Sequence, residues 1–95
     1  MAQIPVREIL ERLEFMRNEM QRMQGELHTY HQKMKQTIDR LEHEGLPQEY
    51  IQKFREEHLN KLSGYFNGLS EHMERESIPY TNKVIDKTEQ LLQSM

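Results

Sequence analysis

A heptad repeat of apolar side chains between Val6 and Leu41 constrains this sequence more than any other feature. Apolar or aromatic residues recur there at alternating intervals of three and four, which keeps one stripe on one side of an α-helix. The first series is Val6, Leu13, Met20, Leu27, Met34 and Leu41, and the second is Ile9, Met16, Met23, Tyr30 and Thr37. Only Thr37 lacks a sizeable apolar side chain. We therefore predict a long helix whose striped face is an interface.

Proline and glycine indicate where this helix begins and ends. Pro5 suits a first helical position, where its missing N–H costs nothing. Gly45 follows the last periodic residue, as in the usual C-terminal stop, and Pro47 suits the start of the next helix. We predict a first helix over about residues 5–44 and a turn at 45–47. So short a link makes the two helices antiparallel neighbours.

The second half of the sequence has a broader apolar face. We predict a helix over about residues 47–76 and a C-terminal helix over about 79–93, with a kink or short gap at Ile78 and Pro79. Whether Pro79 kinks the second helix or starts a separate one stays open. A face this broad can pack on the first helix and on a second molecule. The interface side chains expected here are Ile51, Phe54, His58, Leu62, Tyr65, Phe66, Leu69 and Met73.

Composition indicates that one chain has too few apolar residues to build a core alone. The 95 residues allow a single domain, of which 35% are hydrophobic and 31% charged, with no Cys to form a disulfide. A partner helix would supply the missing burial. We therefore predict an all-α fold: an antiparallel helical hairpin of two long helices, with a short C-terminal helix or kinked extension. This hairpin is expected to dimerise into a four-helix-bundle or coiled-coil-like assembly.

Charge and hydropathy exclude several classes of partner. A net charge of −3 argues against nucleic acid, because phosphate contacts need clustered Lys and Arg. No apolar run approaches the roughly 20 residues that cross a bilayer, and no apolar segment of a signal peptide follows Met1. We expect a cytoplasmic protein, with export by a route that lacks a cleaved signal peptide left open.

No set of residues in the sequence indicates catalysis or a cofactor. His28 and His31 are three apart on the first helix, but without Cys a tetrahedral zinc site would need a second chain. The serines lack the Gly-x-Ser-x-Gly turn of hydrolases, and phosphate-binding glycine loops are missing. His58 is expected to be a partly buried interface residue, with a pH-sensitive contact as the alternative. We expect no enzyme activity, no cofactor and no metal.

The layout resembles a known family of small helical proteins. A short, acidic, Cys-free chain with two long helices and a central glycine turn is similar to the Trp-X-Gly (WXG-type, early-secreted-antigen-like) helical-hairpin family of type VII secretion. The family signature lies at the turn, where the aligned triplet is His43-Glu44-Gly45: the Gly matches and the Trp is absent, as in a divergent member. The resemblance runs from about Val6 to Leu92. It implies a hairpin fold, dimerisation and no enzyme activity.

Two further stretches bear on this resemblance. The run Phe54, Leu59, Leu62 and Phe66 is similar to the apolar stripe by which the family's second helix packs on the first. The family's export signal is Tyr-x-x-x-Asp/Glu after the second helix. Tyr80 is the nearest counterpart here, but Val84 stands where the acidic residue would be.

Three functional hypotheses follow from the sequence. The first is a non-enzymatic interaction module, a hairpin that forms a homodimer, or a heterodimer with a related hairpin, as small type VII secretion-associated proteins do. The second is a cytosolic coiled-coil adaptor or chaperone whose first helix binds a client helix. The third is a metal-binding helical bundle, which metal analysis of the purified protein would test.

Overall fold

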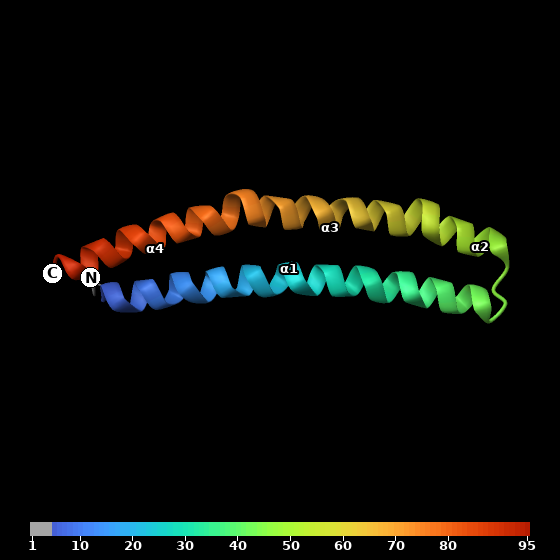
Figure 1. Ribbon diagram of the computed structural model, residues 1–95, viewed down its shortest axis with the longest axis horizontal. Coiled ribbons are helices and arrows are strands. Elements are labelled where there is room, and N and C mark those ends of the chain that lie inside the picture. The colour runs from blue at the N-terminus through green and yellow to red at the C-terminus, as the bar shows by residue number, and fades with distance from the viewer. Residues whose placement is uncertain (1–4) are drawn as a thin grey trace. The chain divides into compact units, whose positions relative to one another are not determined.

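The computed structural model describes residues 5–95, and every regular element within that range is helical. The long helix α1 (Val6–His43) is followed by a turn and by a second arm of five consecutive helical segments. These segments are α2 (Gln48–Lys53), η1 (Phe54–Leu59), α3 (Asn60–His72), η2 (Met73–Ser77) and α4 (Ile78–Gln93). The second arm runs antiparallel to α1 (Figure 1). The predicted all-α antiparallel hairpin is therefore confirmed.

The turn between the two arms is built around Gly45. Its φ of 101° lies in the left-handed region that favours glycine. The amide of Leu46 donates to the carbonyl of Leu41 at 3.0 Å, and that of Gly45 donates to Glu42 at 3.2 Å. This pair of hydrogen bonds is the Schellman arrangement, which satisfies carbonyls left open at a helix end. The chain then enters the second arm at Pro47.

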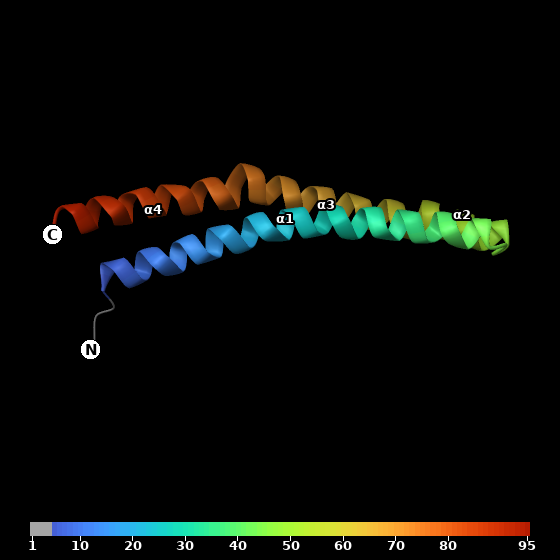
Figure 2. The same cartoon turned by 60° about the horizontal axis from the view of Figure 1, so that its bottom comes forward.

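The chain divides into two compact units that each pair part of α1 with part of the second arm. Of the described residues, the first unit contains 5–23 and 72–95, and the second contains 24–71. In the second unit the two arms lie side by side in both views and are joined by the turn (Figure 1 and Figure 2). The sequence predicted a single domain without this division.

The first unit is held by apolar side chains and self-satisfied threonines. Met73 and Ile85 are buried, and so are Thr81 and Thr88. The Thr81 hydroxyl donates to the Ser77 carbonyl and that of Thr88 donates to the Val84 carbonyl, each at 2.8 Å. Because these hydroxyls bond within their own helix, their methyl groups can face the opposite arm at no polar cost.

Helical backbone continues through Ile78 and Pro79, so no gap interrupts the second arm there. The π-helical segment η2 directly precedes them, and the Ile78 amide donates to the carbonyl of Met73 five residues back. A proline lacks an amide donor and its ring crowds the carbonyl four residues earlier. The π segment η2 thus lies where the proline ring would crowd a regular α-helix.

Candidate protein-interaction surface

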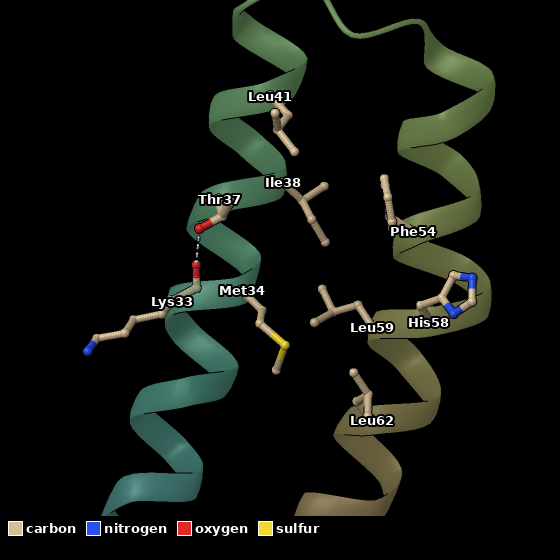
Figure 3. A pocket seen from close by; sticks show the side chains of 9 residues that line it. All are labelled: Lys33, Met34, Thr37, Ile38, Leu41, Phe54, His58, Leu59 and Leu62. Atoms are coloured by element: carbon tan, nitrogen blue, oxygen red, sulfur yellow. Dashed lines mark hydrogen bonds between the residues drawn. The ribbon is translucent and has the colours of Figure 1, made fainter.

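An apolar groove lies between the two arms of the second unit, with a volume of about 520 Å³ (Figure 3). Its lining combines one face of α1 with one face of η1 and the start of α3. The lining residues are Lys33, Met34, Thr37, Ile38, Leu41, Phe54, His58, Leu59 and Leu62.

Helical spacing brings these side chains to one groove. Met34, Ile38 and Leu41 are four and three residues apart, so they share a face of α1. On the second arm, η1 adds one residue to the turn, since the amide of Asn60 donates to the carbonyl of Arg55. π turns of this kind are frequent at functional sites. Here the π turn lies within the wall of the groove.

The floor of the groove is formed by side chains that lie between the two arms, and its rim is formed by side chains in solvent. Met34, Ile38 and Leu59 project into the space between the arms (Figure 3), where Ile38 is only 9% exposed. On the rim, Phe54 and Leu62 remain 41% and 36% exposed. Large apolar side chains left in water at the edge of an apolar groove indicate a surface that binds another molecule.

Polar groups at the rim do not close the groove. The Thr37 hydroxyl donates to the Lys33 carbonyl at 2.8 Å, so it needs no external partner. His58 is exposed and points away from α1, with its ring 6.1 Å from the ring of Phe54 and tilted by 53° (Figure 3). The partial burial expected of His58 is therefore absent from the single chain, because its position on η1 directs it outward.

The other side of the seam in the second unit is bridged by polar contacts. Arg55 donates to both carboxylate oxygens of Glu42 at 3.0 Å and to Asp39 at 2.8 Å. Farther along, the Gln24 amide donates to the carbonyl of Ser70 at 2.9 Å. None of Arg55, Glu42 and Asp39 lines the groove, so these bonds form outside its apolar rim.

These hydrogen bonds also shift the pKa values of Glu42 and Arg55. Hydrogen bonds from Arg55 and then Gln48 lower the pKa of Glu42 below its ordinary value. Hydrogen bonds to Glu42 and Asp39 raise the pKa of Arg55. Both shifts favour the charged forms, so Arg55 and Glu42 form an ion pair at neutral pH. We call the side of the seam that carries this pair the polar edge.

The structure divides the predicted interface residues into two groups. Nine are buried or half-buried in the single chain: Val6, Leu13, Met20, Leu27, Met34, Leu41, Ile51, Phe66 and Met73. Nine others are exposed: Ile9, Met16, Met23, Tyr30, Phe54, His58, Leu62, Tyr65 and Leu69. The exposed group does not belong to the core of one chain, and its place in an interface stays a prediction.

The intrachain seam on α1 combines the first heptad series with residues outside the second series. Instead of the series that begins at Ile9, the residues one position later face the second arm. These residues are Leu10, Arg17, Gln24, His31 and Ile38, all buried or half-buried. An apolar repeat does not reveal this series, because three of its five side chains are polar. Two of these polar side chains have partners on the second arm: Arg17 donates to Asn82 at 3.4 Å, and Gln24 donates to Ser70.

The two histidines of α1 that are three residues apart lie in different surroundings. His31 is half-buried beside Phe66, whereas His28 is exposed. Among residues 5–95, no three His, Cys, Asp or Glu side chains come together as a group that could hold a metal ion. Within the same range, no helix has both the length and the apolar character needed to cross a membrane.

No protein-family model, curated protein or solved structure matches this chain. The surface is therefore interpreted from its own residues.

Proposed function

We propose that this protein is a non-enzymatic interaction module that acts as a dimer of helical hairpins. The observation that carries the proposal is the apolar groove of the second unit, whose rim residues Phe54 and Leu62 lie in solvent. Two such hairpins placed together would cover each rim with a helix of the partner and complete a four-helix core. The polar edge at Arg55 and Glu42 would remain in water, where its charges need no desolvation.

Sedimentation equilibrium at micromolar concentration tests this proposal. The expected species has twice the chain mass of 11.6 kDa, whereas a single species of 11.6 kDa would contradict dimerisation. Leu62→Glu places a charge on the rim and should give a folded monomer. Leu91→Glu is the matched control, because Leu91 is also an exposed leucine but lies outside the groove. Circular dichroism should show equal helix content in both variants.

A client-binding adaptor or chaperone is the second candidate. Met16 and Met23 of α1 are 47% and 44% exposed, and methionine side chains adapt to irregular apolar partners. An amphipathic client helix could lie along the side of α1 that exposes these methionines. This candidate is favoured if the protein is monomeric and an amphipathic helical peptide binds it in titration calorimetry. A stable dimer that excludes the peptide argues against it.

The resemblance to the Trp-X-Gly family supports the same dimeric assembly, and we extend the proposal to divergent membership. Gly45, which matches the signature glycine, has the positive φ that such a turn position requires. Export with the family's machinery is tested by comparing culture filtrates of the native host with and without that machinery. Detection of the protein in both filtrates, or in neither, would argue against export by this route.

A further inference from the structure

A series of charged residues on α1 specifies how a second copy would pack. With Val6 and Ile9 as heptad positions a and d, position g carries Arg12, Glu19, Glu26, Lys33 and Arg40. We infer that α1 packs antiparallel on α1 of a second copy, with Glu26 beside Lys33 of the partner subunit and Glu19 beside Arg40 of the partner subunit. This inference rests on the proposed dimer and adds its orientation and register.

The two flanks of the α1 stripe are available to different neighbours. Position e, four residues after each position a, faces the chain's own second arm. Ile38 is buried there, and the Gln24 amide donates to the Ser70 carbonyl. Position d is open, since Tyr30 is 53% exposed. Position g lies beyond d, on the side away from the second arm. A second copy can therefore approach α1 only across the d and g positions.

The signs of the g charges favour an antiparallel neighbour. Antiparallel helices bring g positions opposite g positions, and these charges set partner orientation. Around a two-fold axis between Glu26 and Lys33, each glutamate meets a lysine or arginine of the partner subunit. Lys33 and Arg40 are exposed and form no ion pair with any residue in the range 5–95. Both cations are thus available to a partner.

Glu19 already accepts a hydrogen bond from Arg22 at 2.7 Å, which lowers its pKa. This pair is exposed, and exposed pairs are weak. Sharing Glu19 with a second cation would therefore cost little.

Other arrangements bring like charges together. Sliding the antiparallel pair by one heptad places Lys33 opposite Lys33 of the partner subunit, or Glu26 opposite Glu26 of the partner subunit. In a parallel pair, g meets the e position five residues later, so Arg12 meets Arg17 of the partner subunit. Like charges so placed destabilise a pairing. Only the proposed register pairs both glutamates with cations.

The same register also forms apolar layers. It places Met23 beside Met34 of the partner subunit, and Tyr30 beside Leu27 of the partner subunit. Met16 then meets Leu41 of the partner subunit. Met16, Met23 and Tyr30 are exposed in the single chain, so this pairing covers the part of the stripe that the hairpin leaves in solvent. Charge and apolar patterns therefore agree on one arrangement.

Charge reversal with mixing tests the register. Lys33→Glu alone and Glu26→Lys alone should each weaken self-association by about tenfold, because two like-charge contacts replace two ion pairs in each dimer. Mixing the two variants should restore wild-type affinity as a heterodimer, since every contact is again between opposite charges. The matched control pair is Gln32→Glu mixed with Gln32→Lys, at an exposed position outside the stripe, which should show no preference for the heterodimer.

Distances between spin labels provide an independent test of orientation. The sequence has no Cys, so Thr29→Cys and His43→Cys each carry a single label. In the proposed dimer, Thr29 lies beside the two-fold axis, whereas the two His43 labels are separated along the helices by about 40 Å at 1.5 Å per residue. Nearly equal distances at both positions would show a parallel pair and overturn the inference. A monomeric wild-type protein would refute the dimer itself, whereas a dimer without heterodimer preference in the mixture would refute only the register.

Discussion

Gly45 shows how one residue can decide where a helix stops. Its φ of 101° is rare for residues with a side chain, and apart from the glycine and its two chain neighbours no atom lies within 4 Å of the site where a Cβ would be. The requirement for glycine is therefore conformational and not steric. It allows Leu46 to return a hydrogen bond to Leu41, which ends α1 and reverses the chain.

Gly45→Ala should consequently lower the free energy of unfolding by about 1 kcal/mol, the cost of holding an L-residue in the left-handed region. Urea denaturation measures the change. Gly64→Ala is the matched control, because Gly64 is helical and open to solvent. That variant should gain up to about 1 kcal/mol from better helix propensity. Equal gains in both variants would show that the turn does not need glycine.

Glu42 makes the stability of the second unit sensitive to acid. Its pKa is lowered in the folded state by the hydrogen bond from Arg55, so the folded protein holds the carboxylate proton less tightly than the unfolded chain. Its stabilising effect is therefore complete above the ordinary pKa of 4.5 and is lost as the pH falls through the lowered folded value.

The variant Glu42→Gln should therefore be less stable than the wild type at pH 7, with the difference shrinking toward pH 3. Urea unfolding midpoints at both values measure this change. Glu49→Gln alters another exposed carboxylate of the same unit and serves as the control. A difference between Glu42→Gln and wild type that grows on acidification would contradict the assigned role of Arg55.

At the scale of elements, the second arm differs from α1 in containing two π turns. Each has an amide that donates to a carbonyl five residues back: Asn60 to Arg55, and Ile78 to Met73. The first lies in the wall of the groove and the second precedes Pro79. A π turn rotates the following residues relative to a regular α-helix.

Pro79→Ala tests whether η2 exists to accommodate the proline. Alanine restores an amide donor and removes the ring, so we expect a gain of up to about 3 kcal/mol in the free energy of unfolding. Thermal unfolding followed by circular dichroism measures it. Pro47→Ala, at the start of the second arm where no amide bond is lost, should change stability far less. A loss of stability in Pro79→Ala would show that the π turn serves packing of the first unit instead.

At the scale of the whole molecule, the proposed function depends on the difference between the two edges of the second unit. One edge is bridged by the ion pairs of Arg55, and the other is an apolar groove with a rim in solvent. A small chain that leaves apolar side chains exposed gains stability when another surface covers them. Association and folding should therefore be linked.

The midpoint of thermal unfolding should accordingly rise with protein concentration, because a dimer is stabilised by mass action. Differential scanning calorimetry over a hundredfold concentration range would measure the rise. In Leu62→Glu the midpoint should be independent of concentration, whereas Leu91→Glu should behave as the wild type. A concentration-independent midpoint in the wild-type protein would contradict the link between association and stability.

The sequence by itself determined the long first helix, the helical character of the second arm and the turn. Periodicity over Val6 to Leu41 predicted α1, and Gly45 with Pro47 predicted the reversal, because helix geometry and glycine stereochemistry are local properties. It also identified the apolar residues that the structure places at the groove, including Met34, Phe54 and Leu62.

Only the tertiary structure decided which face of α1 the hairpin uses. The seam rotates toward Gln24 and Ile38 because Arg17, Gln24 and Arg55 find polar partners across it, and such pairings depend on residues distant in the sequence. The same rotation leaves Met23 and Tyr30 in solvent. Periodicity cannot distinguish a stripe covered by the same chain from one awaiting a partner, since both require the same apolar residues at the same spacing.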